Sequence, residues 1–314
     1  MSQSNGSSVT RVLVIGSINM DLVVTTPAVP QLGETLMGEG FATHAGGKGA
    51  NQAVAAARLG ARVAMVGRVG RDAFGAQLKA GLAAEGVDVQ WVRETDGVPT
   101  GVAAITVSQA DNAIIVVGGA NLQVTPADLD AAQAAFAEAD VVLVQLEVPL
   151  ATVEHAAALA ERHGKPFILN PAPAQPLPAA LLARCALITP NEYELAISLG
   201  QAAGAPQGWQ QQLATLPGRV AMTKGGEGAF HVDAQGRLHH QPGFAVQPVD
   251  TTGAGDTFNG ALAAFWPQGV TAAMRLACAA AALSVTRPGA QGGMPTRAQL
   301  DAFLAEAGES AVRS

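Results

Sequence analysis

Cysteine and aromatic residues are scarce in this chain of 314 residues, and their scarcity excludes several classes of protein. The two cysteines, Cys185 and Cys278, lie far apart, so the sequence contains no disulfide framework of the kind that stabilises small secreted domains. Aromatic residues make up only 4% and the formal net charge is −7. Both values argue against a protein that binds nucleic acid by base stacking or by phosphate contacts.

Long apolar runs are also missing. The most apolar late stretch, residues 276–285, is too short to span a bilayer. The N-terminal segment MSQSNGSSVT is polar and lacks the apolar region of a signal peptide. The sequence therefore predicts a cytoplasmic protein with reduced thiols and with no membrane or nucleic-acid partner. Residues 1–10 are expected to be a disordered tail.

The composition does supply a sizeable core, because 49% of the residues are apolar. Short runs rich in β-branched residues alternate with segments of helical period, which predicts βαβ units around a parallel sheet. Buried strands are expected at residues 11–16, 63–66, 141–145, 167–169, 187–189 and 219–223. Helices are expected at residues 51–59, 74–85, 153–163, 256–265 and 271–285.

Two β-rich stretches interrupt this alternation, at residues 21–40 and 100–117. We expect antiparallel strands that leave the main sheet together and form a small β layer over one edge of the α/β body. A layer of this kind usually closes over a ligand, although a pair of hairpins without function has the same pattern. The expected organisation is one α/β domain over residues 11–308, with a β lid from about 21–45 and 98–120.

Polar residues follow the first strand and precede the first helix. Asn19 and Asp21 are two residues apart on an extended chain, so both side chains point the same way and can bind vicinal hydroxyls; an Asx-turn is the structural alternative. The segment GGKGAN (residues 46–51) offers close backbone approach, a charge on Lys48 and the amide of Asn51, although such a segment can also be only a turn. It is not a Walker A loop, because Gly49 stands where that motif needs Ser or Thr.

The longest motif is DTTGAGDTFNG, residues 250–260. Gly253, Ala254 and Gly255 can present consecutive N–H groups as an anion-binding nest, and Asp256 follows in the first turn of a helix. Phosphoryl transfer needs such a nest for the charge of the transition state and a base for the acceptor hydroxyl. The alternative is a glycine-rich turn in which Asp256 only caps the helix.

Three further segments follow predicted strands and suit a nucleotide or a sugar. Asn191 and Glu194 could hold magnesium through water, or could form the N-terminus of a capped helix. The glycines of residues 223–228 permit close approach to a triphosphate, or form a tight hairpin. Glu147 faces the expected ligand edge, but a lone carboxylate is more often a solvated loop residue.

Taken together, these motifs resemble the ribokinase/PfkB family of carbohydrate kinases, from about residue 12 to residue 304. GGKGAN with its following helix and DTTGAGDTFNG carry the resemblance, and the second is highly specific to the family. GSINMD, Gly119-Ala120-Asn121, QLE at residues 145–147 and NPAPA at residues 170–174 are similar to the members that phosphorylate ribose. The resemblance implies a Rossmann-like, mostly parallel sheet flanked by helices, with a small β-sheet lid.

The resemblance also implies an activity and a set of site residues. The activity is transfer of the ATP γ-phosphoryl group to the 5-hydroxyl of D-ribose, with Asp256 as general base, the nest Gly253–Gly255 around the phosphoryl group, and a homodimer as the assembly. Sugar contacts are implied for Asn19, Asp21, Gly47, Lys48, Asn51, Glu147 and Asp256. ATP contacts are implied for Asn191, Thr223, Lys224, Gly225, Gly226, Glu227, Gly228, Gly255 and Cys278. A potassium site is implied at Asp250, Thr252, Ser284, Arg287, Gly289 and Gly293. Family members often carry Ser at the position of Gly293, so only a carbonyl ligand is available there.

Three other functions are compatible with parts of the pattern. A kinase of the same family could act on deoxyribose, fructose, adenosine or pseudouridine, although Asn19, Asp21 and Glu147 favour a small polyhydroxylated sugar. A dinucleotide-dependent oxidoreductase would need spaced glycines after the first strand, and GSINMD lacks them. A sugar-binding regulator without activity would have no use for Asp256 beside a complete nest.

Overall fold

The computed structural model describes residues 9–109, 111–201 and 208–312. A six-stranded sheet of order β10-β9-β8-β1-β4-β5 forms its centre, and every pairing in it is parallel. The strands are β1 (Arg11–Ile15), β4 (Arg62–Gly70), β5 (Asp88–Thr95), β8 (Val141–Val144), β9 (Phe167–Leu169) and β10 (Leu187–Ile188). The predicted fold class is therefore confirmed. The tail expected over residues 1–10 falls mainly on residues 1–8, which lie outside the described residues.

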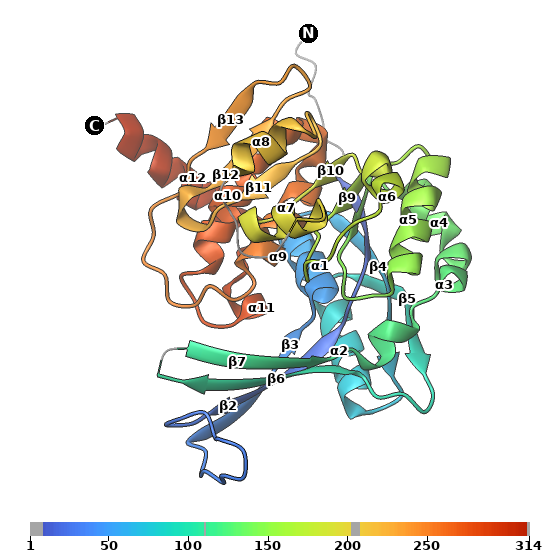
Figure 1. Ribbon diagram of the computed structural model, residues 1–314, viewed down its shortest axis with the longest axis vertical. Helices are drawn as coiled ribbons and strands as arrows, with labels where there is room; N and C mark the ends of the chain where they lie inside the picture. Colours follow the sequence, from blue (N-terminus) through green and yellow to red (C-terminus); the bar gives the residue numbers. More distant parts are fainter. Residues whose placement is uncertain (1–8, 110, 202–207, 313–314) are drawn as a thin grey trace.

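Successive residues of β1 point to opposite faces of the sheet, and each face has its own core. Val12 and Val14 pack into one cluster of buried residues, while Leu13 and Ile15 pack into another. The first face carries α1 (Lys48–Arg58), α2 (Ala73–Ala84), α9 (Ala254–Ala264), α10 (Val270–Ser284) and α12 (Arg297–Val312). The second carries α3 (Pro126–Ala131), α4 (Gln133–Glu138), α5 (Leu150–Arg162), α6 (Ala179–Arg184), α7 (Glu192–Ser198) and α8 (Trp209–Ala214) (Figure 1).

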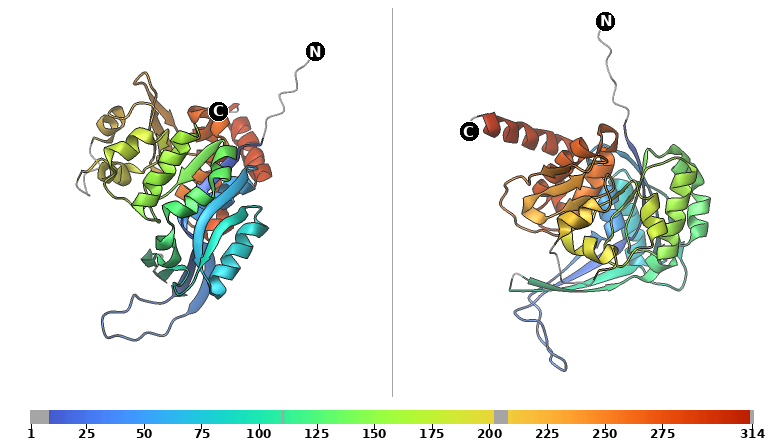
Figure 2. Two further views of the ribbon diagram at one scale, coloured as in Figure 1. Left: turned by 90° about the vertical axis from the view of Figure 1, so that its right-hand side faces the viewer. Right: turned by 45° about the horizontal axis from the view of Figure 1, so that its top comes forward.

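A separate four-stranded sheet projects from the main body (Figure 2). Its order is β3-β2-β6-β7, from β2 (Asn19–Thr25), β3 (Gly40–Gly46), β6 (Gly101–Ser108) and β7 (Asp111–Val117). The prediction of antiparallel strands is right for the two outer pairs and wrong for the central pair, because β2 and β6 run parallel. The β-rich stretch at 21–40 is also shorter than expected, since no strand is assigned between β2 and β3. The role of this sheet as a lid stays a prediction.

The predicted strand at 219–223 has a different place from the others. It is β11 (Ala221–Thr223), the first strand of a three-stranded antiparallel sheet with β12 (Ala229–Val232) and β13 (Leu238–Gln241). Two isolated parallel bridges, Ile188 to Val220 and Asn191 to Thr223, connect it to the edge of the central sheet. The loops after β10 and β11 therefore emerge side by side.

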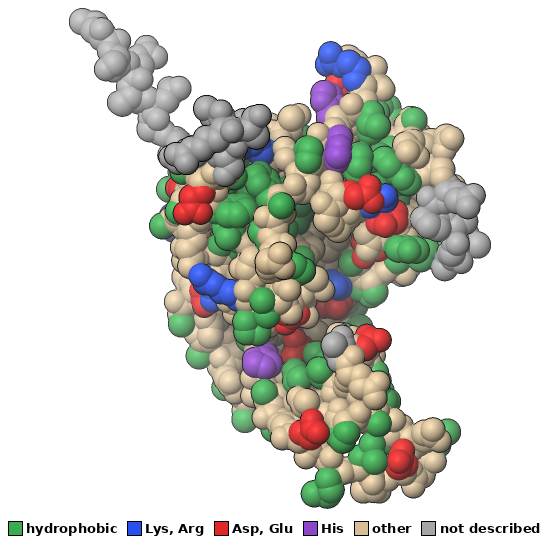
Figure 3. Space-filling model, turned by 90° about the vertical axis from the view of Figure 1, so that its left-hand side faces the viewer, with side chains coloured by type: hydrophobic (Ala, Val, Ile, Leu, Met, Phe, Trp, Pro, Cys, Tyr) green, Lys and Arg blue, Asp and Glu red, His purple; other side chains and the backbone are tan. Residues whose placement is uncertain are grey.

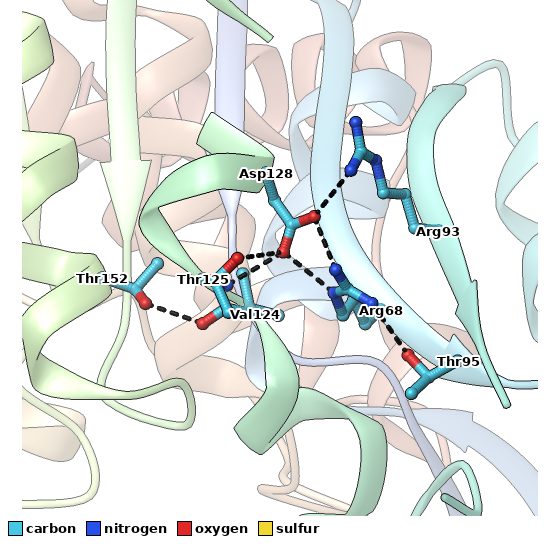
Figure 4. A network of polar contacts seen from close by, with 7 residues as sticks. All are labelled: Arg68, Arg93, Thr95, Val124, Thr125, Asp128 and Thr152. Atoms are coloured by element: carbon cyan, nitrogen blue, oxygen red, sulfur yellow. Dashed lines mark hydrogen bonds and ion pairs between the residues drawn. The ribbon is translucent and has the colours of Figure 1, made fainter. Parts of the chain in front are cut away.

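A buried ion-pair network anchors the second helical layer to the sheet (Figure 4). Asp128 of α3 is 2% exposed and accepts from Arg68 at 2.8 Å and from Arg93 at 3.1 Å. It also closes the capping box with Thr125 at the start of α3. Burial alone would raise the pKa of Asp128, but the hydrogen bonds from these donors outweigh it and lower the pKa.

Within the described ranges, no helix is both long and apolar enough to cross a membrane.

Candidate active site

The turn after β1 and the N-terminus of α1 pack directly against each other. A Cβ on Gly49 would lie 2.6 Å from backbone atoms of Gly16 and Ser17, so only glycine allows this contact. The N–H of Ala50 donates to the Ser17 carbonyl at 2.9 Å. Gly47 is the N-cap of α1 with φ of 88°, a conformation that favours glycine. The GGKGAN segment is therefore a close backbone contact at the carboxyl end of β1.

Asn19 and Asp21 lie on β2, at the root of the four-stranded sheet. Asn19 is buried, and its Oδ1 accepts from Asn121 Nδ2 at 2.6 Å. The Asp21 carboxylate lies over Gly46, where a Cβ would come within 2.4 Å of both carboxylate oxygens. Burial, followed by repulsion from Glu147 and Asp256, raises the pKa of Asp21 to about 6. The two side chains thus follow the carboxyl end of β1, as the sequence predicts.

Glu147 and Lys48 belong to the same charged group. Glu147 Oε2 accepts from the Ser17 hydroxyl and, at 3.1 Å, from the N–H of Lys48, so it is not a solvated loop carboxylate. Burial of Lys48 opposes its charge, but attraction to Asp256, Glu147, Glu194 and Asp21 outweighs burial and raises its pKa. In the space-filling view the molecule is hollowed between the main body and the four-stranded sheet, and acidic side chains gather there (Figure 3).

Asp256 lies in the first turn of α9 and is 8% exposed. Asn51 Nδ2 donates to its Oδ2 at 2.9 Å, and Gln52 Nε2 donates to its Oδ1 at 3.0 Å. Burial raises the pKa of this carboxyl, while the charge of Lys48 and the two amide donors oppose the rise. A carboxylate with a raised pKa, held by amides next to a lysine, can accept a proton from a bound hydroxyl.

The N-terminus of α9 offers main-chain donors beside this carboxylate. Gly253 is its N-cap in the left-handed conformation, with φ of 77°. The N–H of Ala254 donates to the Thr251 carbonyl at 3.2 Å, whereas the N–H groups of Gly255 and Asp256 find no protein acceptor within the described part of the chain. A Cβ on Gly255 would meet nothing within 4 Å. These free amides and the space next to Gly255 can accommodate an anion.

The segments expected to meet ATP lie at the ends of β10 and β11. Asn191 caps α7 by accepting from the N–H groups of Tyr193 and Glu194, and Glu194 accepts in return from the N–H of Asn191 at 2.9 Å. The structural alternative, a capped helix, is therefore present. Burial raises the pKa of Glu194, and Lys48 opposes this. Residues 223–228 form a short turn in which Lys224 and Glu227 pair at 2.5 Å.

Cys278 lies in the core on α10 and is 7% exposed. Burial raises the pKa of its thiol to about 12, so the thiol stays protonated at neutral pH. The contact of Cys278 with ATP stays a prediction.

The residues expected to bind potassium gather around the segment that precedes α9 and around α11 (Ala290–Gly293). Asp250 accepts from the N–H groups of Thr252 at 2.9 Å and Gly289 at 2.7 Å, and these bonds lower its pKa against the effect of burial. A Cβ on Gly293 would lie 2.1 Å from the Ser284 carbonyl oxygen and 3.4 Å from that of Arg287. These contacts bring the Ser284 and Arg287 carbonyls close to Gly293 and connect Asp250 with Gly289; their use as cation ligands stays a prediction. Among the described residues, no cluster of three or more His, Cys, Asp or Glu side chains could hold a metal ion.

Sequence reasoning missed the buried amides that support the site. Gln52 is fully buried; its Nε2 also donates to Asn170 Oδ1 at 3.1 Å, and its Oε1 accepts from Gln145 Nε2 at 2.6 Å. Gln291 of α11 donates to Asn51 Oδ1 at 3.0 Å. The position of Gln52 directly after GGKGAN was a usable signal, because residues in the first turn of a helix lie near its N-terminal ligand. Nothing local in the sequence points to Gln291.

Comparison with known proteins places the chain in a family. Residues 9–297 match the pfkB family carbohydrate kinase. The chain is 44% identical to the ribokinase of Bacillus subtilis, over 93% of this chain and 99% of that protein. It is 36% identical to the deoxyribokinase of Salmonella typhimurium, over 93% of this chain and 98% of that protein.

A solved structure shows the same fold. The ribokinase of Arabidopsis thaliana, complexed with ribose and ATP, has a TM-score of 0.85 and 33% sequence identity, over 94% of this chain and 98% of that chain. Sequence and structure comparisons therefore agree on the family and on the fold. The chain belongs to the pfkB family of carbohydrate kinases.

Proposed function

We propose that the chain transfers the γ-phosphoryl group of ATP to the 5-hydroxyl of D-ribose, with Asp256 as the general base. The observation that carries this proposal is the buried carboxylate of Asp256 beside the free N–H groups of Gly255 and Asp256. The relatives named ribokinase support ribose as acceptor. The deoxyribokinase relative makes 2-deoxyribose the alternative acceptor within the same reaction.

The residues divide the work between the sugar and the phosphoryl group. Asn19, Asp21 and Glu147 would hold the ring hydroxyls, so that the 5-hydroxyl points at the γ-phosphorus. Lys48, whose raised pKa keeps it charged, would balance the surrounding carboxylates. The four-stranded sheet would cover the sugar and exclude water, which otherwise competes as acceptor. Asn191 and residues 223–228 would lie against the nucleotide.

In the transfer step the O5–phosphorus bond forms while the bond between the γ-phosphorus and the ADP oxygen breaks. The hydroxyl proton moves to the Asp256 carboxylate. The Gly255 and Asp256 N–H groups would receive the charge that collects on the equatorial phosphoryl oxygens. The Glu194 carboxylate would hold magnesium through water, and the ion would supply positive charge that neutralises the phosphates.

The potassium site is part of the same proposal. Asp250 lies three residues before Gly253 and bonds to Gly289, so its donor set connects the start of α9 with α11. A cation there would add positive field next to the free amides. We therefore expect potassium to raise the rate of transfer.

The test is ADP release measured with ribose, 2-deoxyribose, fructose, adenosine and pseudouridine, each with and without potassium. Asp256→Asn should lower kcat roughly 10²–10⁴-fold, the usual contribution of a positioned base, with a much smaller change in KM for ribose. Asp301→Asn on α12 is the matched control, because Asp301 is exposed and pairs with the exposed Arg297. Near-normal kcat in the Asp256 variant would remove this residue from the role.

We also propose that two copies of the chain pair through the four-stranded sheet. β7 is an edge strand whose residues are all exposed, including Ile115 at 70%, and Phe41 on β3 is 68% exposed. β3 and β7 are the two opposite edges of the sheet, and uncovered apolar edges favour pairing with another chain. Sedimentation equilibrium should give a dimer, and Ile115→Lys should give a monomer. A monomeric wild-type protein at micromolar concentration would contradict this assembly.

Because ATP is the donor, we place the activity in the cytoplasm. Cell fractionation with a kinase assay on each fraction tests the location.

A further inference from the structure

Asp256 is connected to α11 through two side-chain amides. Gln291 Nε2 donates to Asn51 Oδ1 at 3.0 Å, and Asn51 Nδ2 donates to Asp256 Oδ2 at 2.9 Å. Asn51 is 6% exposed and Asp256 is 8% exposed. The Asn51 side-chain amide can therefore not exchange either partner for bulk water without a rearrangement.

The chemistry of the two ends fixes the direction of the amide. An ionised carboxylate only accepts hydrogen bonds, so Asn51 must present Nδ2 to Asp256. Its Oδ1 then faces Gln291 and needs a donor. In the opposite orientation Oδ1 would face Oδ2 of Asp256, and the pair would hold together only if Asp256 were protonated. An asparagine amide has nearly the same shape in both orientations, so only its partners choose between them.

We propose that Gln291 is a positioning residue that holds the Asn51 amide in the orientation in which its Nδ2, and not its Oδ1, faces the Asp256 carboxylate. This inference rests on the proposed role of Asp256 as the base. Gln291 itself touches neither the carboxylate nor the expected position of the sugar in any contact described above. It acts through Asn51, and its effect is to keep the base in the form that can accept a proton.

The main chain of Gln291 is held independently of its side chain. Arg58 Nη1 donates to the Gln291 carbonyl at 2.5 Å and to the Met294 carbonyl at 3.1 Å. The Arg58 guanidinium is itself fixed by Glu85 at 2.6 Å. A substitution of the Gln291 side chain therefore leaves the anchors of α11 intact, and its effect on Asp256 can be separated from a loss of fold.

Other groups around Asp256 set the background for its protonation. Lys48 favours the ionised form, while Glu147, Asp21 and Glu194 disfavour it. Gln52 Nε2 continues to donate to Oδ1 whatever residue stands at 291. Loss of Gln291 should therefore lower the fraction of Asp256 that is ionised at low pH, and so lower kcat there, without abolishing activity.

The experiment is the pH profile of kcat for Gln291→Leu and Gln291→Glu. Leucine removes the donor, whereas an ionised glutamate accepts from Asn51 Nδ2 and so drives the amide into the opposite orientation. We expect the acid limb of kcat to move to higher pH by about one unit in Gln291→Leu, the effect of roughly one hydrogen bond to a charged group. The shift should be larger in Gln291→Glu. Both variants should approach the wild-type kcat at high pH.

Gln268→Glu is the control for added charge, since Gln268 is exposed and follows the C-terminal end of α9, away from Asp256. It should leave the profile unchanged. Profiles of the Gln291 variants that coincide with wild type, or that fall equally at every pH, would overturn the proposal. If Asp256→Asn retains kcat, the base has been wrongly assigned. If Asp256→Asn is inactive and the Gln291 profiles do not shift, only the positioning role is wrong.

Discussion

Gly253 and Gly255 stand two residues apart at the start of α9, and substituting each by alanine should give opposite results. Gly253 has φ of 77°, and a Cβ there would lie 2.8 Å from the Cβ of Ala290. Gly255 has no positive φ, and its added Cβ would meet no atom within 4 Å. The first position is closed by the protein itself. The second is open on the side where the phosphoryl group is proposed to bind.

The magnitudes follow from these two environments. Gly253→Ala must place an L-residue in the left-handed region, at about 1–2 kcal/mol, and must also displace Ala290, which adds about 1 kcal/mol or more. Gly255→Ala adds a methyl group to the first turn of a helix, where alanine is preferred over glycine by up to about 1 kcal/mol. Gly255→Ala should therefore unfold at the same temperature as wild type or slightly higher, and Gly253→Ala several degrees lower.

Gly255→Ala, the stable variant, should nevertheless lose activity. The methyl group of Gly255→Ala would occupy the space next to the free amides and displace the phosphoryl group. Displacement of about 1 Å costs on the order of 10²-fold in rate. The assay pairs thermal unfolding with ADP release at saturating ribose. A stable Gly255→Ala protein with normal kcat and normal KM for ATP would refute the assignment of this space to the phosphoryl group.

Two further predictions concern pH and stability. Because the pKa of Asp21 is raised to about 6, the ionised fraction of its carboxylate falls below that pH, and ribose binding that uses the carboxylate as an acceptor should weaken as pH falls. The dissociation constant of ribose, measured by calorimetry, should rise roughly tenfold per pH unit below 6, and Asp21→Asn should lose this dependence; an unchanged slope would show that another group is responsible. Asp128→Ala should lower the free energy of unfolding by about 3 kcal/mol, because it removes the buried carboxylate that pairs with Arg68 and leaves only the neutral Thr95 hydroxyl as a partner of that guanidinium. Urea denaturation measures this, with Asp301→Ala as the exposed control, and equal midpoints for the two variants would contradict it.

Much of the fold could be predicted from sequence because local patterns determine it. The apolar run of β1 needs a sheet that is covered on both faces, and its alternate residues do pack into separate cores. The parallel pairing of β2 with β6 could not be predicted in the same way. The two strands are about 80 residues apart, and their pairing depends on how the loops before them leave the main sheet.

In the candidate site too, the residues that local sequence patterns indicate could be predicted, and those that depend on distant contacts could not. Asp256, Asn51 and Lys48 lie in motifs whose glycines indicate a tight turn or a close backbone approach, so these residues could be selected from the local sequence. The structure brings them together. Gln291 was not predictable, because its contact with Asn51 spans 240 residues. Asn191 and Glu194 show a third case: the capping box explains the residue types completely, so the sequence pattern alone did not distinguish a helix cap from a magnesium site.

The placement of Asn19 and Asp21 on β2 has a thermodynamic consequence. These two side chains belong to the projecting sheet, whereas Asp256 and the free amides belong to α9 of the main body. If the sheet closes over the sugar as predicted, a sugar that contacts both groups would connect the two parts, and its affinity would include the free energy of drawing them together. Substitutions far from the sugar that change the angle of the sheet should therefore be detectable as changes in sugar affinity, and bound sugar should in turn slow hydrogen exchange in β2 and β6.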